Sequence, residues 1–294
     1  MRPVVLVALP LPLSGEKGPL VVDRTAHSSW RGFWEKGGWW RALLAVVVYF
    51  VIYQFVPLLF APLFPRVDAS DAAATVWLYY VIPIAFGAVV LFVFAWSVGW
   101  LRELFGPQPI RGRGWMWLAV AIVLLFNMLH FAGVDYAAAG AGVVIAWLVA
   151  GLFIGVAEEV LTRGIVVNLL RKAGHREITV AVISAAFFAA LHSGNLLTGQ
   201  ALLPTLIQLV YTFSFGILMY LSLRVTGNLI WPILLHATTD PSIFLLTSYP
   251  TAGAVTSVAN LGNPVVTISG VVLLIFIRGQ IARREDTRFE PATA

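Results

Sequence analysis

The sequence contains no cysteine and few charged residues. The absence of cysteine excludes disulfides and thiolate metal sites. Charged residues make up only 11% of the 294 residues, whereas soluble globular domains average about 25%. Hydrophobic residues make up 60% of the chain, and its mean hydropathy is +0.88. The sequence therefore predicts an all-α, polytopic membrane protein.

Lysine is also scarce: only three of the 19 basic residues are lysines. Such arginine-rich usage favours a bacterial or archaeal genome of high GC content, and hence a bacterial plasma membrane as the location. The formal net charge is +5, but the basic residues are scattered and form no long block. Positive charge on cytoplasmic loops explains this excess. We expect the lipid bilayer as a partner and no nucleic acid.

Eight apolar segments follow a basic, tryptophan-rich N-terminal stretch, and most reach the roughly 20 residues that a spanning helix needs. The fourth is too long for one straight crossing, so we expect it to tilt or to extend beyond the bilayer. Pro232 and Pro241 predict a kink or break in the seventh. The segments lie at about 42–64, 73–100, 115–133, 138–170, 178–193, 201–223, 228–247 and 264–282.

The distribution of basic residues predicts the orientation of the chain. With eight segments, 17 of the 19 basic residues fall on one side of the membrane. Arg66 alone falls on the other side, and Arg163 lies within a segment. The positive-inside rule therefore places both termini in the cytoplasm. We expect an N-terminal tail over residues 1–40, one membrane domain over 41–282 and a C-terminal tail over 283–294.

Two adjacent carboxylates and an arginine interrupt the fourth apolar segment. Ionisable side chains inside a membrane segment are rare and usually face the protein interior or a wet cavity. In a helix, Glu159 and Arg163 share a face and can form an ion pair. Glu158 then points away from that pair and is available for another role. Charges that simply extend into water from a helix end are the plainer alternative.

Two histidines in later segments reach a similar depth. Glu158 is 13 residues from Arg171, His192 is 16 from Arg176, and His236 is 12 from Arg224. At about 1.5 Å per helical residue, each lies on the order of 18–24 Å from its loop. Asp240 follows His236 by one turn and shares its face. This convergence indicates a functional site, and small residues such as Gly151 and Gly155 would let the helices approach closely.

These side chains fit more than one chemistry. A carboxylate beside an imidazole can hold and deprotonate water, and a second histidine can donate to a developing oxyanion. Those groups suffice to hydrolyse an amide without a covalent nucleophile. Two histidines and a carboxylate also match a catalytic zinc site. A proton relay in a carrier can be built from the same residue types.

Three motifs resemble those of the CPBP (CAAX protease and bacteriocin-processing, or Abi) intramembrane proteases, whose best-known eukaryotic branch is the type II CAAX prenyl protease. They are Glu-Glu-x-x-x-Arg at 158–163, Phe-x-x-x-His from Phe188 to His192, and His-x-x-x-Asp from His236 to Asp240. They occur in the family's order within a core of 150–242, and Thr226-Gly227-Asn228 leads into the third motif as in the family.

The resemblance implies roles for these residues. Glu158 would activate water with the help of His192, and His236 would stabilise the oxyanion. Glu159 and Arg163 would support the site, and Arg163 could also meet a substrate carboxylate. Two departures stand out. Asp240 occupies a position where the family often has asparagine, so it would be protonated, orient His236 or bind a metal. Thr162 replaces a common aromatic residue, which affects the expected substrate preference.

We therefore predict an intramembrane endopeptidase that acts on membrane-associated, CAAX-like or lipid-anchored proteins or peptides. Its catalytic residues would be Glu158, His192, His236 and Asp240, supported by Glu159, Arg163 and Phe188. We expect no cofactor and no metal ligand. Three alternatives remain: a zinc metalloprotease that uses His192, His236 and a carboxylate, a non-catalytic immunity or scaffolding protein, and a proton-coupled carrier.

Overall fold

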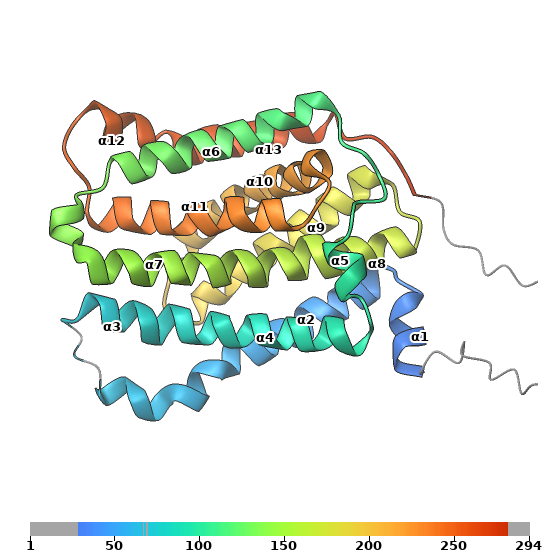
Figure 1. Cartoon of the computed structure of the whole chain (residues 1–294), viewed down its shortest axis with the longest axis horizontal. Helices are drawn as coiled ribbons and strands as arrows, with labels where there is room; N and C mark the ends of the chain where they lie inside the picture. The colour runs from blue at the N-terminus through green and yellow to red at the C-terminus, as the bar shows by residue number, and fades with distance from the viewer. Residues whose placement is uncertain (1–28, 67, 69, 282–294) are drawn as a thin grey trace, which may run out of the picture.

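The computed structural model describes residues 29–66, 68 and 70–281, so most of both predicted tails lies outside it. The described chain is a helical bundle without a β-strand (Figure 1), which confirms the predicted all-α class. Its helices are α1 (Ser29–Glu35), α2 (Trp39–Phe60), η1 (Ala61–Arg66), α3 (Ala72–Val76), η2 (Trp77–Val81), α4 (Ile82–Ser97), α5 (Leu101–Phe105), η3 (Gly114–Met116), α6 (Trp117–Ala132), α7 (Tyr136–Glu159), η4 (Val160–Val166), α8 (Val167–Lys172), α9 (Glu177–Leu191), η5 (His192–Leu196), α10 (Leu202–Thr226), α11 (Ile230–Ser248), α12 (Ala254–Ala259) and α13 (Gly262–Leu274).

Seven helical stretches of the described chain are long and apolar enough to cross a membrane. They correspond to seven of the eight predicted segments, so the chain is a polytopic membrane protein. The predicted segment 228–247 is a helix too, α11, but it is not among these seven. His236, Asp240 and their neighbouring threonines lower its apolar character. The helix outside this set of seven therefore carries two of the predicted site residues, His236 and Asp240.

The fourth segment is longer than one crossing, as predicted. Helices α7, η4 and α8 together cover the 37 residues from Tyr136 to Lys172, with a kink at Gly140, whose φ is +74°. The part after the kink alone spans roughly 48 Å at about 1.5 Å per residue, well above the ~30 Å of a hydrocarbon core. The C-terminal part of this rod consequently extends beyond the apolar region.

Helix α7 lies at the centre of the bundle and packs closely along α11 (Figure 1). Two glycines make this approach possible. A Cβ atom on Gly155 would lie 2.5 Å from the Ile233 carbonyl oxygen and 2.9 Å from the Ala237 nitrogen. One on Gly151 would collide with Pro241 and the Ala237 carbonyl oxygen. This is the close contact that small residues spaced by four permit in membranes.

The prolines of α11 do not interrupt it. Pro232 lies in the first turn, where the missing N–H costs little. Pro241 lies inside the helix, which continues to Ser248. Because proline has no N–H, it leaves the Ala237 carbonyl without its usual helical donor. That carbonyl faces Gly151 of α7, so the predicted break is replaced by a tight helix–helix contact.

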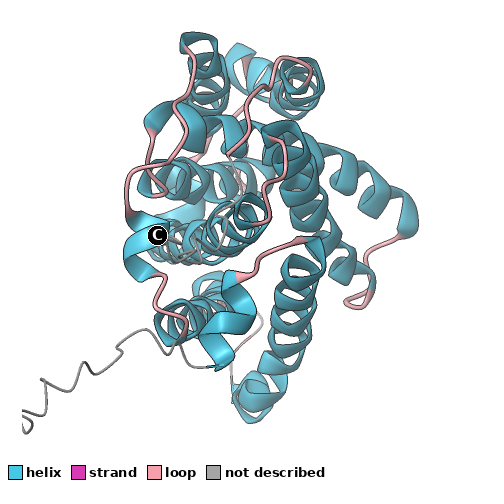
Figure 2. Ribbon diagram, turned by 90° about the vertical axis from the view of Figure 1, so that its right-hand side faces the viewer, coloured by secondary structure: helices cyan, strands magenta, loops and turns pink. Residues whose placement is uncertain are grey.

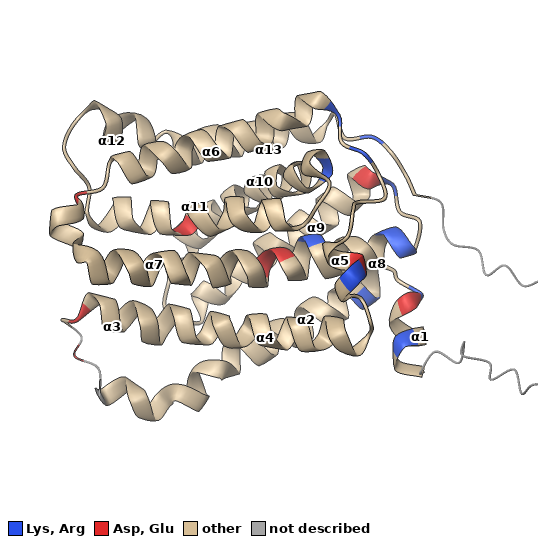
Figure 3. Cartoon of the chain, viewed as in Figure 1, with Lys and Arg blue, Asp and Glu red and all other residues tan. Residues whose placement is uncertain are grey.

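Charge is distributed unevenly along the bundle. Figure 2 looks along the helices and shows them packed side by side, joined by loops at their ends. Lysines and arginines gather at the end that contains α1, α5 and α8 (Figure 3). Both ends of the described chain also lie at this basic end (Figure 1). A cytoplasmic location for this end is still a prediction from the positive-inside rule. Acidic residues also lie at the C-terminal end of α7 and midway along α11, away from both ends of the bundle.

Candidate active site

Glu159 is the last residue of α7 and is completely buried. Its Oε1 atom accepts hydrogen bonds from Arg163 Nη1 at 3.0 Å and from His236 Nδ1 at 2.7 Å. A buried carboxylate needs such partners, because an uncompensated charge in the interior costs several kcal/mol. Glu159 thus joins α11 to the α7–η4 rod. The sequence predicted its pairing with Arg163 but not its contact with His236.

Arg163 is 1% exposed and lies in the π-helical turn η4. Its Nη1 also donates to Thr162 Oγ1 at 2.6 Å, and its Nη2 donates to the Gly216 carbonyl oxygen at 2.9 Å. The guanidinium carbon lies 4.5 Å from the ring centroid of Phe188. Arg163 therefore connects η4 with α9 and α10. Single π-turns within α-helices frequently occur at functional sites.

Glu158 occupies a different environment from its neighbour. A helix rotates by about 100° per residue, so the two carboxylates leave α7 in different directions. The Glu158 side chain is 20% exposed, and its Oε2 atom lies 3.6 Å from His236 Nε2. Oε2 makes no hydrogen bond within the described chain. Thr162 fixes the Glu158 backbone, because its Oγ1 donates to the Glu158 carbonyl oxygen at 2.6 Å. The side chain itself is left available.

His236 is held on several sides and is 1% exposed. Its Nδ1 is bonded to Glu159, and Phe188 and Phe215 contact its ring edge to face at centroid distances of 5.7 and 4.9 Å. Helix α11 is itself fixed by Asn127 of α6, whose Nδ2 contacts the Leu235 carbonyl and two threonine hydroxyls. Only the Nε2 side of His236 remains, and it faces Glu158 and Asp240.

His192 directly follows α9 and lies beside Phe188, with ring centroids 5.0 Å apart. Its Nδ1 is 3.0 Å from the Phe188 carbonyl oxygen. Since a carbonyl can only accept, Nδ1 carries the proton, and in the neutral ring Nε2 carries the lone pair. Phe188 thus contacts both histidines and Arg163, so this predicted supporting residue packs at the centre of the cluster.

Asp240 Oδ1 lies 3.9 Å from His236 Nε2, which is too far for a hydrogen bond. Asp240 therefore does not orient His236. Glu159 orients it, through its hydrogen bond with His236 Nδ1. The side chain of Asp240 is 28% exposed. The structure therefore brings Glu158, His236 and Asp240 together around one imidazole nitrogen.

The zinc alternative requires His192, His236 and a carboxylate to surround one ion. Among the residues that the structure describes, no three His, Asp or Glu side chains are grouped so that they could hold a metal. The donor set consequently does not fit zinc as it stands, and we derive no step through a metal. The metal-free mechanism stays a prediction.

Three tyrosines near the site were missed from the sequence. Tyr49 and Tyr53 of α2 stack on one another with centroids 6.0 Å apart and lie within electrostatic range of Glu158. Tyr211 of α10 lies within the same range of Asp240 and stacks on Phe215. Aromatic residues are common in membrane helices, so no local sequence signal distinguishes these three from packing residues.

The fold and the site define a polytopic helical membrane protein with a buried glutamate–arginine–histidine cluster beside a second, available glutamate. Residues 140–241 match the family model described as type II CAAX prenyl endopeptidase Rce1-like. The chain is related to the CAAX protease family through this segment, which is about a third of its length and contains every predicted site residue. This relationship indicates a peptidase of the CAAX type. No curated protein and no solved structure matches the chain.

Proposed function

We propose that the protein is an intramembrane endopeptidase in which Glu158 activates water for attack on a peptide bond of a membrane-associated substrate. The observation that carries this proposal is the contrast between the adjacent glutamates. Glu159 is fully buried and its Oε1 accepts two hydrogen bonds, although its Oε2 accepts none. Glu158 is 20% exposed, and its Oε2 has no hydrogen bond and lies 3.6 Å from His236 Nε2. A general base needs such an available carboxylate next to a polar partner.

In this mechanism a water molecule donates its two hydrogens to Glu158 and to the lone pair on His192 Nε2. Glu158 takes one proton as the water oxygen attacks the substrate carbonyl. The developing oxyanion accepts a hydrogen bond from Nε2–H of His236 in its imidazolium form, while Glu159 holds the opposite ring nitrogen. Glu158 then gives its proton to the leaving nitrogen, and the C–N bond breaks.

Asp240 bears directly on this step because it lies on the Nε2 side of His236. An ionised Asp240 would repel the oxyanion, so we infer that it is protonated during catalysis. A protonated carboxyl group can itself donate a hydrogen bond to the substrate oxygen. Asparagine, common at this position in the related family, donates without a change in protonation.

The test uses the full-length protein in proteoliposomes with internally quenched peptides that carry a lipid-modified cysteine near the C-terminus. We expect cleavage by the wild type and a loss of about 10²–10⁴-fold in kcat for Glu158→Gln, the range for removal of a general base. Glu103→Gln, the same chemical change at an exposed residue of α5, serves as the control. Equal cleavage by wild type and Glu158→Gln would overturn the proposal.

The same preparations separate the alternatives. A non-catalytic immunity or scaffolding protein would keep its cellular effect after Glu158→Gln, whereas an enzyme would lose it. A carrier would move its substrate into the liposomes without cleaving it. For zinc, the metal content of wild type and His236→Ala would be measured side by side. About one zinc per chain, lost in the variant, would contradict the metal-free mechanism.

A further inference from the structure

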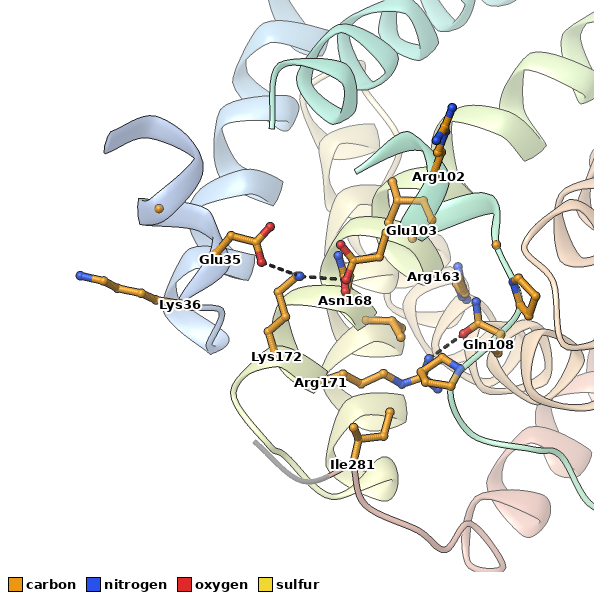
Figure 4. Close-up of a pocket in the computed structure, with 17 residues that line it drawn as sticks. Glu35, Lys36, Arg102, Glu103, Gln108, Arg163, Asn168, Arg171, Lys172 and Ile281 are labelled. Atoms are coloured by element: carbon orange, nitrogen blue, oxygen red, sulfur yellow. Dashed lines mark hydrogen bonds and ion pairs between the residues drawn. The ribbon is translucent and has the colours of Figure 1, made fainter. Parts of the chain in front are cut away.

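Thr162 stands where the related family commonly has an aromatic residue, and the sequence predicted an effect on substrate preference. The structure places this side chain in the π-helical turn η4, where it is 0% exposed. A cavity of about 620 Å³ opens nearby, at the basic end between α1, α5 and the η4–α8 rod (Figure 4). Its lining includes Arg163 and Gly164 but not Thr162. Thr162 therefore contacts neither a substrate nor the cavity, and its role lies within the protein.

The Thr162 hydroxyl makes two hydrogen bonds, one as a donor and one as an acceptor. Oγ1 donates to the Glu158 carbonyl oxygen at 2.6 Å and accepts from Arg163 Nη1 at 2.6 Å. The first bond is ordinary, because threonines in helices often donate to the carbonyl four residues back, as Thr205 and Thr212 of α10 do. The second bond distinguishes Thr162, since it comes from a buried charged group and such bonds are roughly twice as strong as neutral ones.

Arg163 Nη1 carries two hydrogens, and they go to two different parts of the site. One is donated to Thr162 and the other to Glu159 Oε1 at 3.0 Å. Glu159 in turn holds His236 Nδ1 at 2.7 Å. The backbone of Glu158 and the ring of His236 are thus connected to the same guanidinium nitrogen. Because Nε of this guanidinium makes no hydrogen bond within the described chain, its orientation depends on the bonds of its Nη atoms.

Glu158 depends on this connection because little else fixes it. Its Oε2 makes no hydrogen bond within the part of the chain that the structure describes, and it lies 3.6 Å from His236 Nε2. We propose that Thr162 is a positioning residue, whose hydroxyl couples the Glu158 backbone to Arg163 and so keeps the general base in place beside His236. The effect on catalysis rests on the proposed function, whereas the coupling of Thr162 to His236 through Arg163 does not.

The first measurement is cleavage of the quenched peptide by the full-length protein in proteoliposomes. Thr162→Val keeps the shape of the side chain but removes the hydroxyl. We expect kcat to fall by about 10–10²-fold with KM unchanged, because a displacement of about 1 Å can cost 10²-fold. Thr162→Ser keeps the hydroxyl and should restore most of the lost kcat. Thr205→Val, which removes a buried hydroxyl that donates within its own helix, should leave kcat unchanged.

A double variant tests whether Thr162 acts through Glu158. Added to Glu158→Gln, the change Thr162→Val should cause no further loss of kcat, because the group that Thr162 positions is already absent. A further loss as large as in the wild-type background would overturn the proposal. Unfolding curves give the folded fraction of each variant, so that kcat is expressed per folded protein. If Thr162→Val does not fold, Thr162→Ala removes the same hydroxyl without added bulk, with Thr205→Ala as its control.

The second measurement does not depend on cleavage. Full-length protein with isotope-labelled histidine is studied by NMR in detergent, and the ring resonances of His236 are assigned from their loss in His236→Gln. Thr162→Val should shift these resonances, because it leaves one hydrogen of Arg163 Nη1 without an acceptor and so disturbs the bond to Glu159. Thr162→Ser and Thr205→Val should leave them in place.

Equal kcat for Thr162→Val and wild type, equal losses for Thr162→Val and Thr162→Ser, or a change confined to KM would each overturn the proposal. Unshifted His236 resonances in Thr162→Val would overturn it as well. If the wild type cleaves no peptide but Thr162→Val shifts the resonances, the proposed function fails and the coupling of Thr162 to His236 stands.

Discussion

Identical substitutions of the adjacent glutamates should have opposite consequences. In Glu159→Gln the buried Arg163 guanidinium loses its carboxylate, and His236 Nδ1 loses a charged partner. Breaking a buried pair by removing one partner costs about 3–5 kcal/mol. For a domain of 150–250 residues this corresponds to a fall in Tm of roughly 6–20 °C, and slightly less for this longer chain.

Glu158→Gln should leave the free energy of unfolding within about 1 kcal/mol of wild type, because Glu158 Oε2 has no hydrogen bond to lose. It should nevertheless abolish peptide cleavage. Unfolding in mixed micelles, followed by tryptophan fluorescence, and cleavage of the quenched peptide would be measured for both variants. The reasoning would be refuted if Glu158→Gln were the less stable protein, or if Glu159→Gln melted with wild type.

Three further results are expected. Gly155→Leu should destabilise the fold by about 1–3 kcal/mol and lower cleavage, because even a Cβ there would lie 2.5 Å from the Ile233 carbonyl oxygen. Gly142→Ala in the same helix is the control. Its Cβ meets Ala73 at 3.5 Å, so this variant should be neutral or stabilising in the same unfolding assay. Asp240→Asn should retain cleavage and remove one ionisation from the pH–rate profile; a complete loss of cleavage would contradict a protonated Asp240. Despite burial, hydrogen bonds from Lys172 and Trp100 lower the pKa of Glu35. The contribution of Glu35 to stability is therefore present above its unfolded pKa and is lost as pH falls through its folded pKa. Glu35→Gln should reduce this acid-induced fall in Tm, and an unchanged pH dependence of Tm would contradict the prediction.

The sequence predicted the helices well because apolar runs of membrane length are a strong signal. It also predicted that Glu158 and His236 approach one another, since a shared depth on several helices leaves few arrangements. Counting helical rise from the basic loops placed Glu158 and His236 at similar depths in the membrane. In the structure Glu158 Oε2 lies 3.6 Å from His236 Nε2. Ion pairing between Glu159 and Arg163 followed from their spacing alone.

Features that depend on the rotation of one helix against another could not be predicted. The contact between Glu159 and His236 requires that α11 turn Nδ1 toward α7, which the glycine contacts and the Asn127 bonds determine. The π-helical turn η4 has no recognised sequence signature here. The cavity at the basic end of the bundle likewise gathers residues from α1, α5 and α8, which lie far apart in the sequence.

The non-catalytic alternative explains only part of the cluster. A scaffold would retain Glu159, Arg163 and His236, because each is fully buried and loss of any one leaves an unpaired polar group. It has no corresponding need for Glu158, a partly exposed carboxylate whose Oε2 has no hydrogen bond. Folding alone would favour an uncharged residue at that position. A partly buried carboxylate without a hydrogen bond of its own is characteristic of active sites, where function is maintained at the expense of stability. Glu158 is therefore the residue that most strongly favours an enzyme.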